Sequence, residues 1–168
     1  MIYTPRRNRD AESLFDSLEP VARGMGMAIL ELSHIRRKGR GGEPGTVQVR
    51  VTIYKNGSIG VEDCSRFHRA VLPRLELAFP GSELDVEVSS PGIGRLIKDG
   101  SEMVHFIGRG VRCYCVDAQT DGSGWVSGTL VSADGKGIVL DTGKERIVLP
   151  YEKIAKAKLD EALQGFKC

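Results

Sequence analysis

Two side chains near the middle of the chain have the types and spacing that nucleophilic catalysis requires. Cys64 and His68 are four residues apart, so on a helix they share one face. A thiol beside an imidazole is the arrangement of a cysteine nucleophile and its general base. The sequence offers no third residue that would orient the histidine. We therefore expect no enzyme, and keep a small Cys/His enzyme as the weakest hypothesis.

Metal and cofactor chemistry finds even less support in the residue spacing. Cys113 and Cys115 share one face of a predicted strand, but no nearby cluster supplies two further metal ligands. The four cysteines form no CxxC pair, so we expect reduced thiols rather than a disulfide framework. Gly92-Ile93-Gly94 is a lone GxG, and Ile97 leaves the dinucleotide-binding motif incomplete. We expect no metal and no cofactor.

A short cationic run is the best candidate for binding nucleic acid. Residues 36–40 contain four cations in a glycine-rich segment, and such a loop can follow a phosphate backbone. The alternative is a solvated hairpin tip. Our hypothetical nucleic-acid-binding residues are these four cations with one arginine of the next strand: Arg36, Arg37, Lys38, Arg40 and Arg50.

An acidic strand face is the second candidate surface. Glu83, Asp85 and Glu87 alternate with apolar residues, so they occupy the polar side of a strand. They are either simply solvated or a docking surface for a basic protein, because complementary potentials steer such encounters.

The overall charge excludes a strongly basic nucleic-acid binder, but the charge is uneven. The formal net charge is +2, while residues 1–59 hold ten Lys/Arg against six Asp/Glu and residues 100–168 hold nine of each. No apolar run approaches the length of a membrane span, and the N-terminal arginines precede no apolar stretch. We therefore expect a cytoplasmic protein without membrane contact.

The first half of the chain must position both charged surfaces. Helical spacing predicts a helix over 10–25, with Pro20 kinking or ending it, and a second from Gly60 to Pro80, interrupted by Pro73. Alternation predicts strands at 27–35, 47–54 and 83–88, with a loop over 36–45. The inward residues are predicted to be Ala28, Leu30 and Leu32 on the first strand, and Phe67, Ala70, Val71, Leu75 and Ala78 on the second helix. The order αββαβ predicts a two-layer α/β domain.

The second half has a different pattern. Residues 110–159 contain four or five short runs of strand-forming residues, separated by turn sequences such as 121–124 and 134–137. This pattern predicts a small β-barrel, with a short helical tail over 158–168. The change of pattern at SSPGIG divides the α+β chain into an N-terminal domain, 1–92, and a C-terminal domain, 93–168.

Several segments together resemble a known family. VRVTIYKNGSIGVEDC, LDVEVSSPGIGR, WVSGTL and IVLPYEKIAKAKL resemble, in order and spacing, the RimP family of bacterial ribosome maturation factors. The resemblance covers roughly residues 10–160, and the interdomain motif within it comprises Ser89, Ser90, Pro91, Gly92 and Arg95. The chain departs from the family pattern at Tyr54, His68, Gly94 and Leu96.

The resemblance implies a fold and a function. It implies an SH3-like C-terminal barrel and a non-catalytic cytoplasmic protein that binds the small (30S) ribosomal subunit and assists its late assembly. It further implies contacts with 16S rRNA and a basic ribosomal protein at the decoding centre. We expect a monomer. A general RNA-binding module with an Sm-like or SH3-like barrel is the second hypothesis, which a basic barrel surface would favour.

Overall fold

The chain folds as two compact units, and each is described here by itself. A computed structural model describes residues 9–57, 59–92, 94–116 and 124–160. One unit comprises residues 7–91, and the other begins at Gly92. The division falls at the SSPG segment, although independent folding of residues 1–92 and 93–168 remains a prediction.

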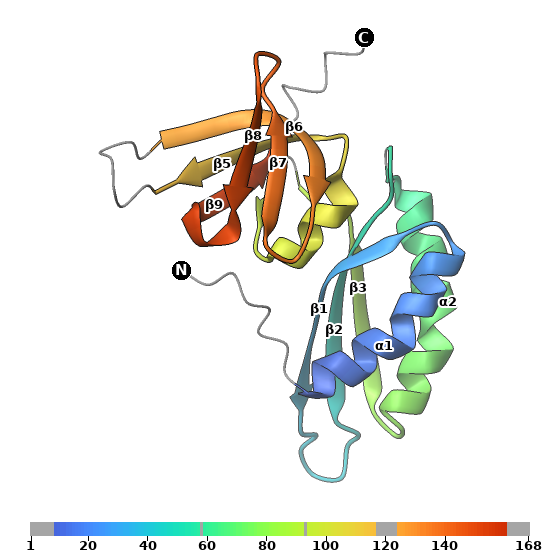
Figure 1. The fold of residues 1–168 in the computed structure, drawn as a ribbon. Coiled ribbons are helices and arrows are strands. Elements are labelled where there is room, and N and C mark those ends of the chain that lie inside the picture. Colours follow the sequence, from blue (N-terminus) through green and yellow to red (C-terminus); the bar gives the residue numbers. More distant parts are fainter. Residues whose placement is uncertain (1–8, 58, 93, 117–123, 161–168) are drawn as a thin grey trace. The chain divides into compact units, whose positions relative to one another are not determined.

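The N-terminal unit is a three-stranded sheet with two helices on one face (Figure 1). Strand order is β1-β2-β3, with β1 antiparallel and β3 parallel to β2. Because β3 is parallel to β2, the intervening helix must cross back over the sheet. In chain order the elements are α1 (Arg9–Gly24), β1 (Ala28–Arg37), β2 (Thr46–Tyr54), α2 (Val61–Ala78) and β3 (Glu83–Ser89). The predicted αββαβ order is confirmed.

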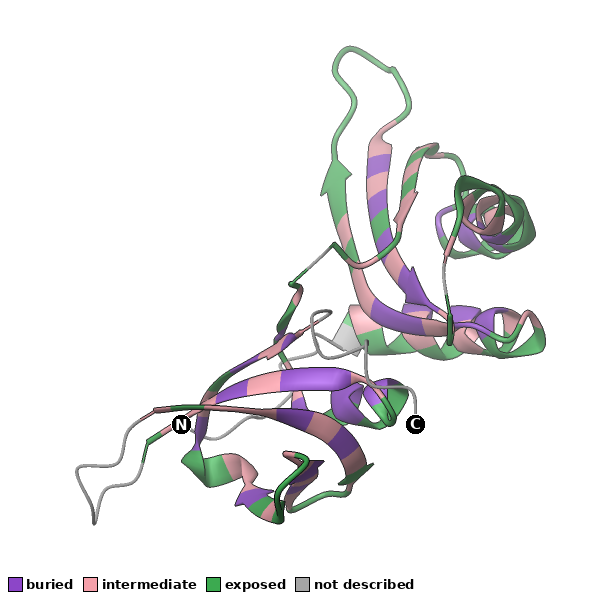
Figure 2. Ribbon diagram, turned by 90° about the horizontal axis from the view of Figure 1, so that it is seen from above, coloured by how far each residue is buried: buried purple, intermediate pink, exposed green. Residues whose placement is uncertain are grey.

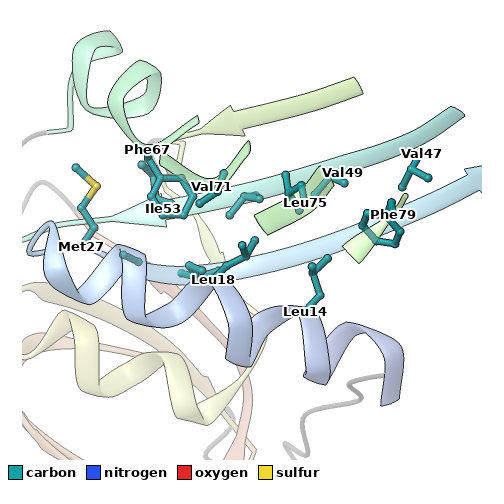
Figure 3. Close-up of a cluster of buried hydrophobic side chains, with 13 residues drawn as sticks. Leu14, Leu18, Met27, Val47, Val49, Ile53, Phe67, Val71, Leu75 and Phe79 are labelled. Carbon is teal, nitrogen blue, oxygen red and sulfur yellow. The ribbon is translucent and has the colours of Figure 1, made fainter. Parts of the chain in front are cut away.

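The core of this unit lies between the helices and the sheet (Figure 3). Alternate residues of β2 point into it, so the burial along that strand has the period of two expected for a half-covered sheet (Figure 2). Each helix contributes residues three or four apart, which gives a continuous apolar stripe. The main contributors are Leu14 and Leu18 of α1, Val47, Val49, Val51 and Ile53 of β2, and Phe67, Val71 and Leu75 of α2.

Neither proline ends its helix: of the two outcomes predicted for Pro20 the early end is wrong, and the predicted interruption at Pro73 is wrong as well. Helix α1 continues past Pro20 to Gly24, and α2 continues past Pro73 to Ala78. Both proline rings are exposed, so each removes a hydrogen bond on the solvent side while the buried face stays intact. Burial of Ala22 after Pro20 and of Leu75 after Pro73 stabilises the helical turns that follow.

Three further details differ from the sequence prediction. The ladder register shifts between Ile29 and Glu31, and Ile29 joins the core between the helices and the sheet, whereas Leu30 is buried outside that cluster. In α2, Ala70 and Ala78 are exposed, because the stripe of buried residues is narrower than predicted.

The C-terminal unit is a six-stranded antiparallel sheet in the order β4-β9-β5-β6-β7-β8. Its core includes Val111, Cys113, Leu130, Leu140 and Ala157. In chain order it contains β4 (Leu96–Ile97), the 3-10 helix η1 (Gly100–Phe106), β5 (Gly110–Cys115), β6 (Gly124–Ala133), β7 (Gly137–Asp141), β8 (Arg146–Pro150), the 3-10 turn η2 (Tyr151–Lys153) and β9 (Ile154–Leu159).

The strand-rich character of this unit is confirmed, but barrel closure is not. Within the described part of the chain, no ladder joins the end strands β4 and β8. The predicted turn at 134–137 is present, since the Asp134 carboxylate accepts the backbone N–H groups of Lys136 at 2.7 Å and Gly137 at 3.0 Å. Most of the turn predicted at 121–124 lies outside the described residues, and so does most of the helical tail predicted over 158–168. The first two residues of that predicted tail, Lys158 and Leu159, belong to strand β9 instead of a helix.

Candidate functional site

The face of the N-terminal sheet opposite the helices carries Arg50 and the candidate acidic residues in neighbouring rows. Arg50 of β2 stands directly opposite Glu87 of β3, and Gln48 stands opposite Asp85. The Arg50 Nε lies 3.2 Å from a Glu87 carboxylate oxygen, and the Gln48 amide donates to Asp85 at 3.0 Å. The register therefore places Arg50, one of the predicted RNA-binding residues, beside the predicted acidic surface on one sheet face.

This pairing changes how Arg50 and Glu87 are understood. One was predicted to bind RNA and the other to dock a protein, yet their charges face each other. Both side chains are well exposed, at 60% and 59%, so the ion pair contributes at most about 1 kcal/mol to stability. The Arg50 guanidinium and the Glu87 carboxylate therefore both remain accessible to a binding partner. Substituting either residue would change the electrostatic potential at the other.

The cationic run does not form a single patch. Arg36 and Arg37 belong to β1 rather than to the predicted loop, so their side chains point to opposite faces of the sheet. The Arg36 guanidinium carbon lies 4.8 Å from the centroid of the Phe79 ring, beyond the end of α2. Arg37 points to the face that carries Arg50.

The remaining two cations extend from the loop between β1 and β2. Lys38 and Arg40 are exposed, as is nearly all of this connection (Figure 2). The connection is tight at its base, because a Cβ at Gly39 would collide with the Glu43 carbonyl oxygen. All four cations are gathered at one end of the sheet but present two different directions.

The acidic residues lie on the outward side of β3, as alternation predicted, and β3 is an edge strand of the sheet. Glu83, Asp85 and Glu87 are exposed, while the apolar residues between them face the helices. Among the described strands of this unit, β3 pairs only with β2. An edge strand with acidic side chains is well suited to approach by a basic segment.

The interdomain motif divides between the two units. Ser89 is the last residue of β3 and pairs with Thr52, whereas Arg95 belongs to the C-terminal unit. The Arg95 guanidinium donates to both carboxylate oxygens of Glu102, at 3.2 and 3.1 Å. These side chains are only 9% and 7% exposed, so the pair is buried. Arg95 is therefore a structural residue of this unit.

The rest of the motif forms the connection itself. Ser90 and Gly92 are exposed and Pro91 is half-buried. The Arg95 backbone N–H donates to the Gly92 carbonyl at 3.2 Å, which makes a turn, and Gly94 within it has a φ of 66°, in the left-handed region that favours glycine. This part of the motif therefore forms a turn at the point where the chain divides into its two units.

The surroundings of the Cys64 thiol weaken the catalytic hypothesis. Cys64 and His68 both line an open depression beside β3, but burial raises the pKa of the Cys64 thiol and the Asp63 carboxylate adds to that effect. A thiol with a raised pKa is a poor nucleophile at neutral pH. Burial likewise raises the pKa of Cys113, to about 12.

Asp63, the neighbour of Cys64, has a structural role. Its carboxylate accepts the Gly60 backbone N–H at 3.0 Å at the start of α2 and lies 2.7 Å from the Lys55 Nζ. The hydrogen bonds from Lys55 and Gly60 lower the pKa of Asp63. Asp63 therefore stabilises the beginning of α2.

Sequence reasoning missed the partners that hold two of these residues. Nothing local marks Glu102 as the partner of Arg95, or Phe79 as the support of Arg36. Among the described residues, no group of three or more His, Cys, Asp or Glu side chains is arranged to hold a metal ion. In that same part of the chain, no helix has the length and apolar character of a membrane span.

Comparison with known proteins gives the family context of this arrangement. Residues 17–94 match the family model of the RimP N-terminal domain. Three curated relatives named ribosome maturation factor RimP align over 150 residues, which is 89% of this chain and 96% of each relative. The resemblance to the RimP family is confirmed. The RimP relatives are from Borrelia turicatae (strain 91E135) and Borrelia hermsii (strain HS1 / DAH), each 24% identical, and Borrelia recurrentis (strain A1), 23% identical.

The RimP N-terminal domain match spans most of the αββαβ unit and ends at Gly94. Alignment with full RimP relatives extends the similarity into the C-terminal unit. A solved structure titled as a putative zinc transporter, CzrB, aligns with 52% of this chain and all of its own at 20% identity, but its TM-score of 0.35 supports no argument.

Proposed function

We propose that this chain is a cytoplasmic ribosome maturation factor that binds the small (30S) ribosomal subunit and assists its late assembly without catalysing a reaction. The observation that carries the proposal is the similarity to RimP proteins over 89% of the chain. The raised pKa of Cys64, in the strongest catalytic candidate, is consistent with a non-catalytic role. We further propose that the protein acts as a monomer and that its C-terminal sheet has an SH3-like fold.

Two sets of side chains would make the contacts. Arg37, Lys38, Arg40 and Arg36 at one end of the N-terminal sheet would meet phosphates of 16S rRNA. The acidic edge on β3, made of Glu83, Asp85 and Glu87, would dock a basic ribosomal protein near the decoding centre. Both sets are exposed and lie in one unit, so a single approach could engage them together.

Sedimentation tests the proposal directly. Purified protein is centrifuged with small subunits, large subunits and free ribosomal RNA, and bound protein is quantified in each fraction. We expect co-sedimentation with small subunits in clear excess over the other two. Equal binding to free RNA would favour the general RNA-binding module and overturn the proposal.

The cationic contribution is tested through its salt dependence. Replacing Arg37, Lys38 and Arg40 by alanine should weaken small-subunit binding and flatten the slope of log affinity against log salt by up to ~1 for each phosphate that is no longer neutralised. A slope equal to that of the unchanged protein would make these residues a solvated hairpin tip. Lys136→Ala, an exposed cation of the C-terminal unit, serves as the control.

The acidic edge is tested by neutralisation. Reversing Glu87 to lysine would place two cations opposite each other, because Arg50 is its cross-strand partner. The cleaner variant combines Glu83→Gln, Asp85→Asn and Glu87→Gln, and should slow association with a basic ribosomal protein. Glu62→Gln with Glu76→Gln, which removes two carboxylates from the exposed side of α2, is the control for charge loss elsewhere on this unit. Unchanged association kinetics would remove β3 from the proposal.

A further inference from the structure

One face of the C-terminal sheet combines aromatic rings with cations. Arg112 and Tyr114 of β5 stand opposite Lys158 and Lys156 of β9, respectively. On the other side of β5, Tyr114 stands opposite Trp125 of β6. Directly opposed residues of antiparallel strands point to the same face. These five side chains therefore share one face across three neighbouring strands, which we call the Trp125 face.

The side chains of the Trp125 face contact one another. The Arg112 guanidinium carbon lies 4.9 Å, and the Lys158 Nζ 5.2 Å, from the centroid of the indole ring. The Tyr114 ring meets the indole edge-on, with centroids 5.3 Å apart. Trp125 is still 43% exposed, so much of a large apolar ring faces solvent. An exposed tryptophan surrounded by cations is not explained by packing of the core.

The opposite face of the same strands already forms the core. Val111 and Cys113 of β5 and Ala157 of β9 alternate with the residues above and are buried. The alternation predicts one buried and one outward face, and the outward one holds the Trp125 cluster.

The charge on the Trp125 face is local rather than a property of the whole segment. Residues 100–168 hold equal numbers of basic and acidic residues, nine of each, so the sequence alone gives a neutral balance. The ladder gathers three of the cations, Arg112, Lys156 and Lys158, on adjacent strands. Asp141 is opposite Thr129, toward the Gly110 end of the sheet, and lies 3.7 Å from Arg146. Asp117 and Asp121 fall outside the described residues.

We propose that the Trp125 face binds single-stranded RNA, with a base stacked on the indole of Trp125 and phosphates held by Arg112, Lys156 and Lys158. Unpaired bases expose aromatic surfaces, and stacking on aromatic side chains accepts any base. A duplex hides those surfaces, so it offers this face only its phosphates. The anionic backbone complements the three cations, and an acidic protein would satisfy the cations but not the aromatic ring.

This site goes beyond the function proposed above, because it lies in the other unit and needs no ribosome. Trp125 is the only tryptophan in the chain, so intrinsic fluorescence reports on this face directly. The full-length protein is titrated with a ten-nucleotide single-stranded RNA, a duplex of the same length, and an abasic ribose-phosphate chain. We expect the single-stranded RNA to quench the emission, and the other two to bind more weakly with little quenching.

Variants assign the parts of the site. Trp125→Ala, measured by anisotropy of labelled RNA, should weaken binding about 5- to 100-fold, and Trp125→Phe should recover part of that affinity. Lys156→Ala should leave quenching by saturating RNA intact but flatten the salt slope by ~0.7 for each phosphate that is no longer neutralised. Lys136→Ala, in the turn between β6 and β7, should change neither quantity.

Three results would overturn the proposal. The first is RNA affinity unchanged in both Trp125→Ala and Lys156→Ala. The second is equal affinity for the duplex, and the third is equal affinity and quenching with poly-glutamate, which would indicate an acidic-protein surface instead. If Trp125→Ala fails to fold, Trp125→Phe and Lys156→Ala decide the question. A β3 variant that no longer binds the small subunit but still binds this RNA would show that the two binding activities are independent, so the two proposals can be judged separately.

Discussion

The salt bridge between Arg95 and Glu102 buries two charges in the C-terminal unit. Arg95, the arginine of the interdomain motif, joins the start of this unit to η1 through this pair. Its backbone carbonyl also accepts the N–H of Leu159, at the end of β9, at 3.0 Å. A single residue thus joins three segments of the unit.

Removing one partner of this pair should be costly. Glu102→Gln removes the carboxylate that pairs with the buried Arg95 guanidinium, and we expect a loss of about 3–5 kcal/mol in the free energy of unfolding of this unit. Denaturant unfolding followed by Trp125 fluorescence measures it.

The double variant Arg95→Met with Glu102→Leu provides the comparison. It removes both charges, so it should recover much of the stability that Glu102→Gln loses. A double variant as unstable as Glu102→Gln would mean that the packing of these side chains, rather than charge burial, dominates.

Asp63 gives the N-terminal unit an acid-sensitive contribution. The pKa of Asp63 is lowered from its ordinary 3.8 by its hydrogen bonds with Lys55 and Gly60. A lowered folded-state pKa means that the contribution is complete above pH 3.8 and is lost as the pH falls through the folded-state pKa. Asp63→Asn should therefore lower α2 stability at pH 7 and approach the unchanged protein in strong acid.

Hydrogen exchange at α2 amides between about pH 4 and 7, with thermal unfolding at lower pH, measures this dependence. Glu62→Gln, an exposed neighbour in the same first turn, controls for the loss of a charge near the helix start. A stability difference between Asp63→Asn and the unchanged protein that persists in strong acid, near about pH 2, would contradict the assignment to the carboxylate.

At the scale of elements, the end of β1 separates two adjacent arginines. Arg36 packs its guanidinium on Phe79, whereas Arg37 points to the other face. We expect Arg36→Ala to lower the free energy of unfolding by about 0.5–1 kcal/mol because it removes the cation–π interaction, and Arg37→Ala to change it by less. Chemical denaturation of the two single variants compares them, and equal effects would show that the interaction with Phe79 contributes nothing.

The periodic elements were the part that the sequence could predict. Val47 to Ile53 alternate so regularly that β2 could be placed in advance, and Gly60 with Pro80 and Gly81 bracketed α2. Both helices continue beyond their prolines, because burial of Ala22 and Leu75 outweighs the low helix propensity of Pro20 and Pro73. Rules based on local sequence do not include this burial. The register shift between Ile29 and Glu31 could not be predicted, because the residue types at these positions do not indicate it.

The candidate site was predictable only as separate runs of residues. Arg50 and Glu87 are far apart in sequence, and only the register of a parallel pair brings them together. The Trp125 face was hidden for the same reason, since its cations belong to two strands separated by three others. Composition counts all the charged residues of a segment together. In a sheet, alternation and strand register decide which of those side chains lie on the same face and next to one another.

For the whole molecule, the position of the division has consequences for fragments. A fragment that begins at residue 100 would lose Arg95 and strand β4, which pairs with β9. We expect residues 92–168 to unfold cooperatively and residues 100–168 to be less stable or unfolded. Thermal unfolding by circular dichroism compares them, and equal midpoints would show that β4 and Arg95 add nothing.

Two binding units on one chain should also act together on the ribosome. If both engage the small subunit, linking them raises the effective concentration of the second contact, commonly by ~10²–10⁴ in affinity. Residues 7–91 and 92–168 mixed as separate fragments should then bind far more weakly than the whole chain in sedimentation. A single fragment that binds as tightly as the whole would place all recognition in one unit.

The sheet order of the C-terminal unit bears on how the protein emerges during its own synthesis. Strand β9 comes last of the described strands in the chain but lies between β4 and β5 in the sheet. Until residues 154–159 have left the exit tunnel, β4 has no neighbour and β5 presents a bare edge. The αββαβ unit ends at Pro91, and we predict that it reaches its native state while translation continues. In a nascent chain paused shortly after β8, we therefore expect a folded N-terminal unit and a C-terminal unit that still exposes an unpaired strand edge. At this stage of synthesis the protein is most prone to aggregation.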